Sequence, residues 1–231
     1  MTASDLKQNL HEILATLAEA ARSAGRSPSE ITLMGVSKTH PYDSILALNE
    51  AGLSLFGENR VQEGESKLPP KEGRPARINL IGHLQSNKAR KALSLFDRID
   101  SVDSLRLAQR LERMLKAPYP ILLEVNTSGE ASKHGFEDEA ALFAALDEIA
   151  GFEHLQVEGL MTLGPLGGDE MATRKAFSAL RTTFERVKER YDLPHFRELS
   201  MGMSGDYRWA IAEGSTCVRI GTALFGQREV R

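Results

Sequence analysis

The chain has 231 residues, of which 41% are hydrophobic and 26% charged, and this composition is typical of a folded globular protein. Its 29 basic and 32 acidic residues leave a formal net charge of -3, which is too balanced for a protein that binds polyanions over its whole surface. No uncharged apolar run approaches the roughly 20 residues that cross a bilayer. The single cysteine, Cys217, and the absence of a signal-peptide pattern predict a cytosolic protein.

An amphipathic helix is predicted over residues 3 to 24, at the start of the chain. Apolar residues recur there at spacings of three and four, which places them on one helix face: Leu6, Leu10, Ile13, Leu14, Leu17 and Ala21. The sequence Ser27-Pro28-Ser29 follows and is expected to end this element.

From residue 31 onward, short apolar runs alternate with helical patterns. The eight runs cover residues 31–36, 53–56, 78–81, 98–102, 121–125, 155–161, 197–200 and 216–220. The clearest helices are one with a predicted N-cap at Asp103 and a long one after residue 170. Eight such units behind one extra helix predict an α/β fold, a single (β/α)8 TIM barrel that occupies residues 1–231 as one domain.

The alternative fold is a doubly wound parallel sheet. That fold is expected to have five or six strands and a G-x-G-x-x-G turn after the first one. The first turn here reads Gly35-Val36-Ser37-Lys38-Thr39, without that glycine pattern. The turn therefore favours the barrel.

The loops after the last two strands carry the features of a phosphate site. Ser204 and Asp206 open a predicted helix, while Gly221 and Thr222 follow the eighth strand. These loops are where TIM barrels most often bind phosphate, because hydroxyls and free backbone N–H groups converge there. Taken singly, each residue is more readily explained by helix capping or by the end of a strand. Their pairing on adjacent strands favours phosphate.

Two basic residues are predicted to point into the barrel. Arg219 alternates with Val218 and Ile220, and a buried guanidinium needs an acceptor, either a protein carboxylate or a ligand. Lys38 ends the first strand, where desolvation or nearby positive charge lowers the pKa of an amine that attacks a carbonyl. Lysine, arginine and phosphate site together indicate a Schiff base with a phosphorylated aldehyde, and pyridoxal 5′-phosphate is the obvious example.

Five motifs then identify a family resemblance that spans nearly the whole chain. They lie at 35–39 (GVSKT), 56–63 (FGENRVQE), 81–88 (IGHLQSNK), 199–204 (LSMGMS) and 218–226 (VRIGTALFG). In these motifs the sequence resembles the pyridoxal phosphate homeostasis proteins, whose barrel is similar to the N-terminal domain of alanine racemase. His134 stands where the family often has serine, and Gly205 where an acidic residue is commoner.

The resemblance implies a set of cofactor contacts. Lys38 is expected to form the Schiff base, and Arg219 to face the pyridine nitrogen. The other implied contacts are the phosphate ligands Met203 (backbone), Ser204, Gly221 and Thr222, a further phosphate contact at Ser200, and Asn59 against the cofactor ring. Lys133 is a candidate for a transient second amine. No role is assigned to His83 or to residues 85–88, and no residue is assigned a catalytic or metal-binding role.

The expected function is that of a cofactor carrier and regulator without established catalysis. An arginine opposite the pyridine nitrogen weakens the ring as an electron sink, and the barrel fills the sequence to Arg231, without a second domain such as racemases use. The expected partners are apo-enzymes, with no nucleic acid and no membrane, and a monomer is expected. The alternatives are a small racemase, or an aldolase in which Glu58 or Glu124 works with Lys38. The basic cluster at residues 88–91 lacks aromatic partners and indicates a solvated helix face.

Overall fold

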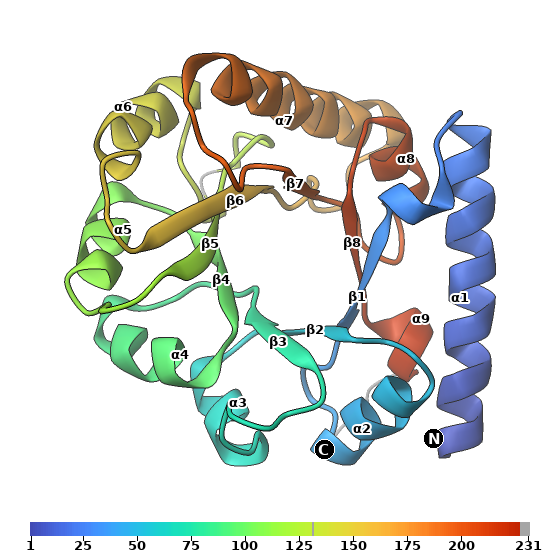
Figure 1. Ribbon diagram of the computed structural model, residues 1–231. Helices are drawn as coiled ribbons and strands as arrows, with labels where there is room; N and C mark the ends of the chain where they lie inside the picture. Colours follow the sequence, from blue (N-terminus) through green and yellow to red (C-terminus); the bar gives the residue numbers. More distant parts are fainter. Residues whose placement is uncertain (131, 227–231) are drawn as a thin grey trace.

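A computed structural model describes residues 1–130 and 132–226. Its strands form a closed parallel barrel in the order β1-β2-β3-β4-β5-β6-β7-β8, and helices surround the barrel (Figure 1). The strands are β1 (Thr32–Val36), β2 (Leu55–Glu58), β3 (Arg77–Leu80), β4 (Arg98–Val102), β5 (Tyr119–Glu124), β6 (Leu155–Met161), β7 (Glu198–Ser200) and β8 (Cys217–Ile220). The predicted TIM barrel is confirmed.

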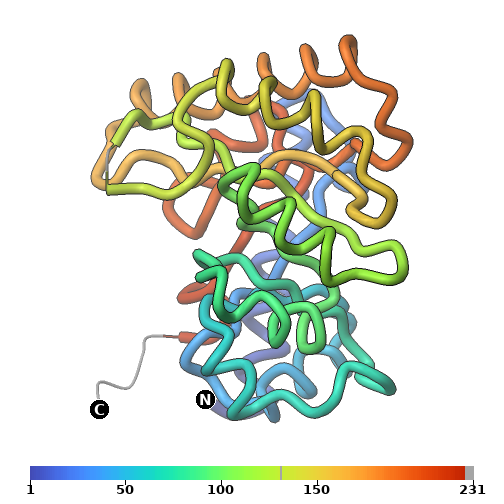
Figure 2. The backbone as a smooth tube through the Cα atoms, turned by 90° about the vertical axis from the view of Figure 1, so that its left-hand side faces the viewer, coloured from blue at the N-terminus to red at the C-terminus, as the bar shows by residue number. Residues whose placement is uncertain are grey.

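The helices follow the strands along the chain. They are α1 (Ala3–Ser23), α2 (Tyr42–Glu50), α3 (Val61–Lys67), α4 (Ala89–Leu95), α5 (Leu105–Glu112), α6 (Glu139–Ile149), α7 (Glu170–Arg190), α8 (Tyr207–Ala212) and α9 (Thr222–Phe225), with short 3-10 turns η1 (Pro28–Glu30) and η2 (Ser86–Lys88). The side view shows α7 on the opposite side of the barrel from α2 and α3 (Figure 2). Within residues 1–130 and 132–226, no helix is long and apolar enough to span a bilayer.

Two predicted boundaries differ from the structure for local reasons. The second strand begins at Leu55 rather than Leu53, because the backbone N–H of Leu53 donates to the carbonyl of Leu48 at 3.0 Å and closes the end of α2. The N-cap of α5 is Ser104, whose hydroxyl accepts from the N–H of Leu107 at 3.3 Å. The carboxylate of Asp103, the predicted N-cap, points to other partners.

The extra helix α1 covers the barrel where β8 meets β1. Its apolar face contacts α2, α8 and α9 (Figure 1). The Asn9 amide donates to the carbonyl of Leu224 at 3.0 Å, and Arg26, just after α1, donates to the carbonyls of Ile211 and Ser215 at 3.0 and 2.7 Å. These contacts hold the last βα unit, and with it the expected phosphate segment, against the first.

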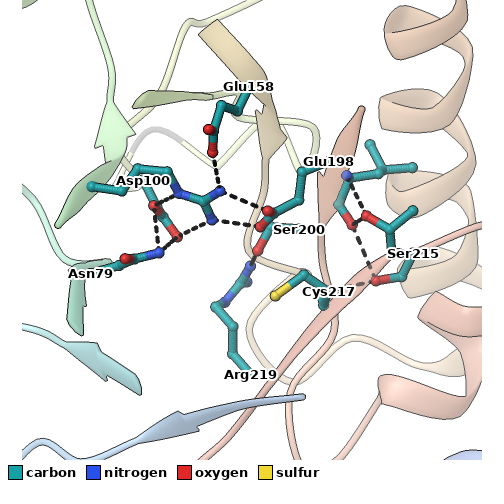
Figure 3. Close-up of polar contacts among 11 residues, drawn as sticks. Asn79, Asp100, Glu158, Glu198, Ser200, Ser215, Cys217 and Arg219 are labelled. Carbon is teal, nitrogen blue, oxygen red and sulfur yellow. Dashed lines mark hydrogen bonds and ion pairs between the residues drawn. The ribbon is translucent and has the colours of Figure 1, made fainter. Parts of the chain in front are cut away.

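An ionic cluster fills part of the barrel interior. The Arg98 guanidinium is 3% exposed and forms ion pairs with Asp100, Glu158 and Glu198 at 2.6 to 2.7 Å (Figure 3). Burial raises the pKa of Asp100 although Arg98 opposes this rise. Because three carboxylates surround one cation, the guanidinium holds together β4, β6 and β7 from within the barrel.

Candidate functional site

All eight strands are parallel, so their carboxyl ends meet at one rim of the barrel, where the active sites of this fold lie. The loops at this rim carry the residues predicted to bind the cofactor. They are Lys38 after β1, Asn59 after β2, Met203 and Ser204 after β7, and Gly221 and Thr222 after β8. Arg219 lies within β8 itself. The fold therefore places the predicted residues of the site along one rim.

Arg219 points into the barrel, as its alternation with apolar neighbours predicts. Its side chain is 3% exposed, and Nη1 donates to Oγ of Ser200 at 2.6 Å (Figure 3). Nη2 donates to the carbonyl of Thr162 at 2.7 Å. Both partners are neutral, and burial lowers the pKa of Arg219 against the opposing carboxylates of Asp100 and Glu124. The guanidinium is thus held by neutral acceptors rather than neutralised by an adjacent carboxylate.

Ser200, which the resemblance implies as a phosphate contact, also bonds to Arg219. It lies in β7, is fully buried, and its hydroxyl oxygen accepts from Arg219. The Ser200 hydroxyl can still donate its own hydrogen to a phosphate while it accepts from Arg219, so the implied phosphate contact stays a prediction. Thr162 is positioned similarly from the next strand, since its own hydroxyl donates to the carbonyl of Val125 at 2.7 Å.

The segment that carries Lys38 is held from outside the barrel by Lys67 of α3. The Lys67 amine donates to the carbonyls of Ser37 and His40 at 2.8 and 2.9 Å, on either side of Lys38. The same amine forms ion pairs with Glu58 and Glu63 at 2.8 and 3.0 Å. A single ammonium group therefore ties the ends of β1 and β2 to α3. Sequence reasoning missed Lys67; the only signal was its i,i+4 spacing from Glu63.

Strain is present immediately after Lys38. Thr39 is the only non-glycine residue of the described chain with a positive φ, at 68°, and β-branched residues rarely adopt this conformation. Its backbone N–H donates to the carboxylate of Glu63, which Lys67 also binds. Such strain persists only where the surrounding contacts determine the backbone, and it concentrates at functional sites. Lys38 is half-buried at the end of this constrained segment.

Glu58 is a strand-end ion-pair partner and not an aldolase-type carboxylate. It is fully buried, binds Lys67, and accepts a hydrogen bond from the Ser37 hydroxyl. Burial raises the pKa of Glu58, and Lys67 opposes that rise. These contacts engage Glu58 on the α3 side of the barrel, so it does not serve as an acid or base beside Lys38.

The phosphate segment has open backbone and hydroxyl groups. Ser204 and Thr222 are exposed, and in the described residues their hydroxyls form no hydrogen bond within the protein. A side chain on Gly221 would meet only Val36, at ordinary contact distances of 3.5 Å or more. Packing therefore does not require glycine there, and the absence of a side chain leaves the backbone open to close approach by an anion. These residues fit a phosphate group.

Met203 and Asp206 refine the predicted phosphate site. The backbone N–H of Met203 donates to the Asp206 carboxylate at 2.5 Å, so a phosphate would have to replace that contact. Asp206 is the N-cap of α8 but makes no side-chain capping bond to the first turn. The sequence suggested that Asp206 caps the helix. In the structure its carboxylate closes the turn before the helix instead.

Asn59 lies where the loops after β2 and β3 touch. A Cβ on Gly82 would come within 2.2 Å of the Asn59 backbone oxygen and 2.8 Å of its side-chain oxygen. Only glycine permits this approach, which positions the half-buried Asn59 side chain at the rim. The predicted contact of Asn59 with a cofactor ring stays a prediction.

On the opposite side of the rim, Glu124 is a buried carboxyl on the inner face of β5. It is 5% exposed, and burial, aided by Asp103 and opposed by Arg219, raises its pKa to about 7. Lys133 also lies on this side: its amine donates to the carbonyl of Gly164 at 2.6 Å and pairs with Glu130 at 2.8 Å. In this arrangement Lys133 links the β5–α6 and β6–α7 loops.

Comparison with known proteins agrees with this geometry. The family model of the alanine racemase N-terminal domain matches residues 8–229. An alanine racemase from Clostridium difficile 630 superposes with a TM-score of 0.72 at 16% identity, over 94% of this chain and 60% of its own, which shows a common fold. The fold and the site thus define the class of barrels that resemble the racemase N-terminal domain.

Nearer relatives narrow this class. The pyridoxal phosphate homeostasis protein of Vibrio cholerae is 39% identical over 231 residues, 97% of each chain. PipY of Synechococcus elongatus PCC7942, solved without and with PLP bound, is 40% and 39% identical and superposes with TM-scores of 0.81 and 0.77, over 91% of this chain and 100% of its own. The chain belongs to the family of pyridoxal phosphate homeostasis proteins.

Proposed function

We propose that this chain binds pyridoxal 5′-phosphate through Lys38 and serves in the homeostasis of that cofactor. The cofactor supplies an aldehyde, which a lysine amine captures covalently with loss of water. The observation that carries the proposal is the convergence on β1 and β8 of a half-buried lysine, a buried arginine and open phosphate donors. The relatives named for this role, and PipY with PLP bound, support it.

The register of β1 and β8 supports the assignment of Lys38 and Arg219 to one ligand. Met34 pairs with Arg219, and Lys38 follows Met34 by two further inward positions. Lys38 therefore ends the strand above the guanidinium, with Gly221 beside Val36 between their levels. A ligand captured by Lys38 would reach Arg219 with its ring and the β7 and β8 loops with its phosphate.

The neutral partners of Arg219 suit a carrier rather than a carbanion enzyme. A guanidinium donates and does not accept, so a ring nitrogen facing it stays unprotonated. An unprotonated ring is a weaker electron sink than a pyridinium. Glu58, one of the two candidate carboxylates for an aldolase, is bound to Lys67 on the α3 side. The residues of this chain therefore favour holding the cofactor over transforming an amino acid.

The biological setting completes the proposal. Reversible capture keeps a reactive aldehyde away from free amines, and apo-enzymes that need the cofactor are the partners that would receive it. Lys133, at the rim, is the candidate second amine for this transfer, and its release from Gly164 and Glu130 would have to come first. We propose that the protein acts as a monomer in the cytosol.

The absorption spectrum after loading tests the proposal. Wild-type protein is incubated with pyridoxal phosphate, passed through gel filtration, reduced with borohydride and mapped by peptide mass, beside Lys38→Ala and Lys133→Ala. We expect colour and a label on Lys38 in wild type and Lys133→Ala, and no colour in Lys38→Ala. Two results would overturn the assignment: colour in Lys38→Ala equal to that of wild type, or a colourless wild type whose Lys38 traps a sugar phosphate instead of pyridoxal phosphate. Activation of an apo-enzyme by the loaded protein, with free cofactor trapped, tests the transfer.

A further inference from the structure

Two histidines and one aspartate meet at the barrel rim, on three loops, and none of these three side chains has a role in the proposed cofactor site. His83 follows β3, Asp103 follows β4 and His134 follows β5. One ligand atom from each of the three side chains lies within 4.8 Å of the others. We propose that these residues form a binding site for a divalent transition-metal ion such as zinc, separate from the binding of pyridoxal phosphate.

The separations suit a single ion. Nδ1 of His83 lies 2.9 Å from Oδ2 of Asp103, and Nδ1 of His134 lies 4.0 Å from the same oxygen. Two ligand atoms that each stand about 2.1 Å from one zinc ion are roughly 3.0 to 3.4 Å apart, depending on the coordination angle. The two observed distances lie on either side of this range, so side-chain rotation is needed to bring the ligand atoms onto one ion.

The donor set selects the class of metal. Two imidazoles and one carboxylate suit zinc, nickel, cobalt or iron, whereas magnesium and calcium prefer sites made of oxygen ligands. Cys217, the only thiol, is buried within the barrel and does not compete for the ion. With three protein ligands, the remaining coordination positions stay open to water or to a small ligand.

Hydrogen bonds hold the backbone near both histidines. The Ser101 hydroxyl donates to the carbonyl of Gly82, next to His83, at 2.7 Å. Beyond His134, the N–H of Phe136 donates to the carbonyl of Glu124 at 2.7 Å and anchors the loop to the end of β5. The segments of the two histidines are thus fixed to neighbouring strands, and Asp103 directly follows β4, which limits the entropy lost when an ion binds.

Asp103 is oriented as metal-binding carboxylates commonly are. The Ser104 hydroxyl donates to Oδ1 of Asp103 at 3.1 Å, while Oδ2 faces both imidazoles. A hydrogen bond to the outer oxygen of a ligating carboxylate fixes its direction and raises its affinity. The choice of Ser104, rather than Asp103, as the N-cap of α5 leaves the aspartate available for this arrangement.

Both imidazoles are free to turn toward an ion. In the structure the two rings stack, with centroids 3.7 Å apart and planes inclined by 11°. Parallel rings do not aim their nitrogen lone pairs at one point, so binding requires rotation of at least one ring. The His83 and His134 side chains are 37% and 54% exposed, and this exposure allows the rotation.

Two cationic side chains near the site oppose the binding of a metal ion, and the removal of one of them serves as a control. His83 also lines a cavity of about 470 Å³ with Arg60, Gln85 and Lys88. The cavity opens the site to solvent, while its two cations repel a bound metal. The affinity therefore rests on the three ligands, and removal of a cation is expected to leave it unchanged or to increase it.

Isothermal titration of the full, untagged chain with zinc chloride tests the site. We expect one equivalent of zinc to bind wild type, nickel to bind at the same site, and magnesium to give no heat. His134→Ser and Asp103→Asn should each weaken zinc binding about 100-fold or abolish it. His195→Gln, which alters an exposed histidine elsewhere, and Lys88→Ala should bind zinc at least as tightly as wild type.

Two results would contradict the metal site. The absence of zinc binding to wild type, or equal binding by wild type, His134→Ser and Asp103→Asn, would overturn the proposal. Thermal unfolding without metal checks that the variants are folded; because the ligands are at the surface, we expect unchanged midpoints. Loading with pyridoxal phosphate is measured separately on the same variants and should be retained, so failure of the metal site and failure of the cofactor site are distinguishable.

Discussion

The hydroxyl oxygen of Ser200 accepts a hydrogen bond from Nη1 of Arg219 at 2.6 Å, inside the barrel and out of contact with solvent. This contact sets the direction of the guanidinium on the inner face of β8. Because the Ser200 hydroxyl keeps its own hydrogen to donate, this contact is compatible with the phosphate contact that the resemblance implies, which stays a prediction. A buried cation with neutral acceptors depends on each of them, because an unmatched donor in the interior carries its full desolvation cost.

Ser200→Ala is expected to destabilise the protein by about 1 to 3 kcal/mol, since it leaves Nη1 of Arg219 without its buried acceptor. Urea unfolding at neutral pH measures this change. Ser94→Ala removes an exposed hydroxyl that bonds only within its own helix, and it serves as the control with an unchanged midpoint. Equal midpoints for Ser200→Ala and wild type would show that the bond contributes nothing to folding.

Lys67→Met should both destabilise the fold and weaken capture of pyridoxal phosphate by Lys38. It leaves Glu58 charged and buried without its cation, at a cost of about 3 to 5 kcal/mol, and frees the carbonyls of Ser37 and His40. Addition of Glu58→Gln should recover much of the stability but not the cofactor affinity. Unfolding curves and spectral titrations measure the two effects.

The control for this prediction is Lys91→Met, which removes an exposed partner of Glu65. No change in unfolding midpoint or cofactor affinity is expected from it, because exposed ion pairs are screened by water. If Lys67→Met kept full cofactor affinity despite lost stability, the proposed positioning of Lys38 by α3 would be wrong.

Arg98→Met is expected to cost about 3 to 5 kcal/mol, because it strands the carboxylates of Asp100 and Glu198 inside the barrel. Guanidinium unfolding measures the loss. Arg186→Met, which breaks an exposed pair with Glu139, should shift the free energy of unfolding by no more than about 0.5 kcal/mol. Comparable losses in the two variants would contradict the importance of burial.

The contribution of Glu124 to stability should fall as the pH rises from about 4.5 to 7, because Glu124 has a pKa of about 7 in the folded protein against 4.5 when unfolded. Between these pH values the Glu124 carboxyl is protonated in the folded state but ionised in the unfolded state. The resulting contribution of Glu124 to the free energy of unfolding is complete below pH 4.5 and is lost as the pH rises through 7. The difference corresponds to about 3 kcal/mol for this group.

Glu124→Gln removes that titration. Urea unfolding of wild type and variant at pH 5 and pH 8 measures the effect: the variant should gain stability relative to wild type between the two values. Because other groups titrate equally in both proteins, the difference between the two profiles isolates Glu124. Parallel profiles would show that the carboxyl is not desolvated.

Local patterns in the sequence were sufficient to predict the barrel. Alternation of apolar runs with amphipathic helices requires parallel strands covered by helices, and eight such units close on themselves. The same period of two places Arg219 on the inner face of β8, between the outward residues Val218 and Ile220. These features depend only on neighbours along the chain.

The partners of those residues were decided by the tertiary structure. Lys67 reaches the segment of Lys38 from α3, and Ser200 contacts Arg219 from the adjacent strand. His83 and His134 are 51 residues apart in the sequence, yet their rings stack. Barrel closure brings such groups together because every strand ends at the same rim. Periodicity reports which face a side chain occupies, whereas the identity of its partner depends on the register and closure of the whole sheet.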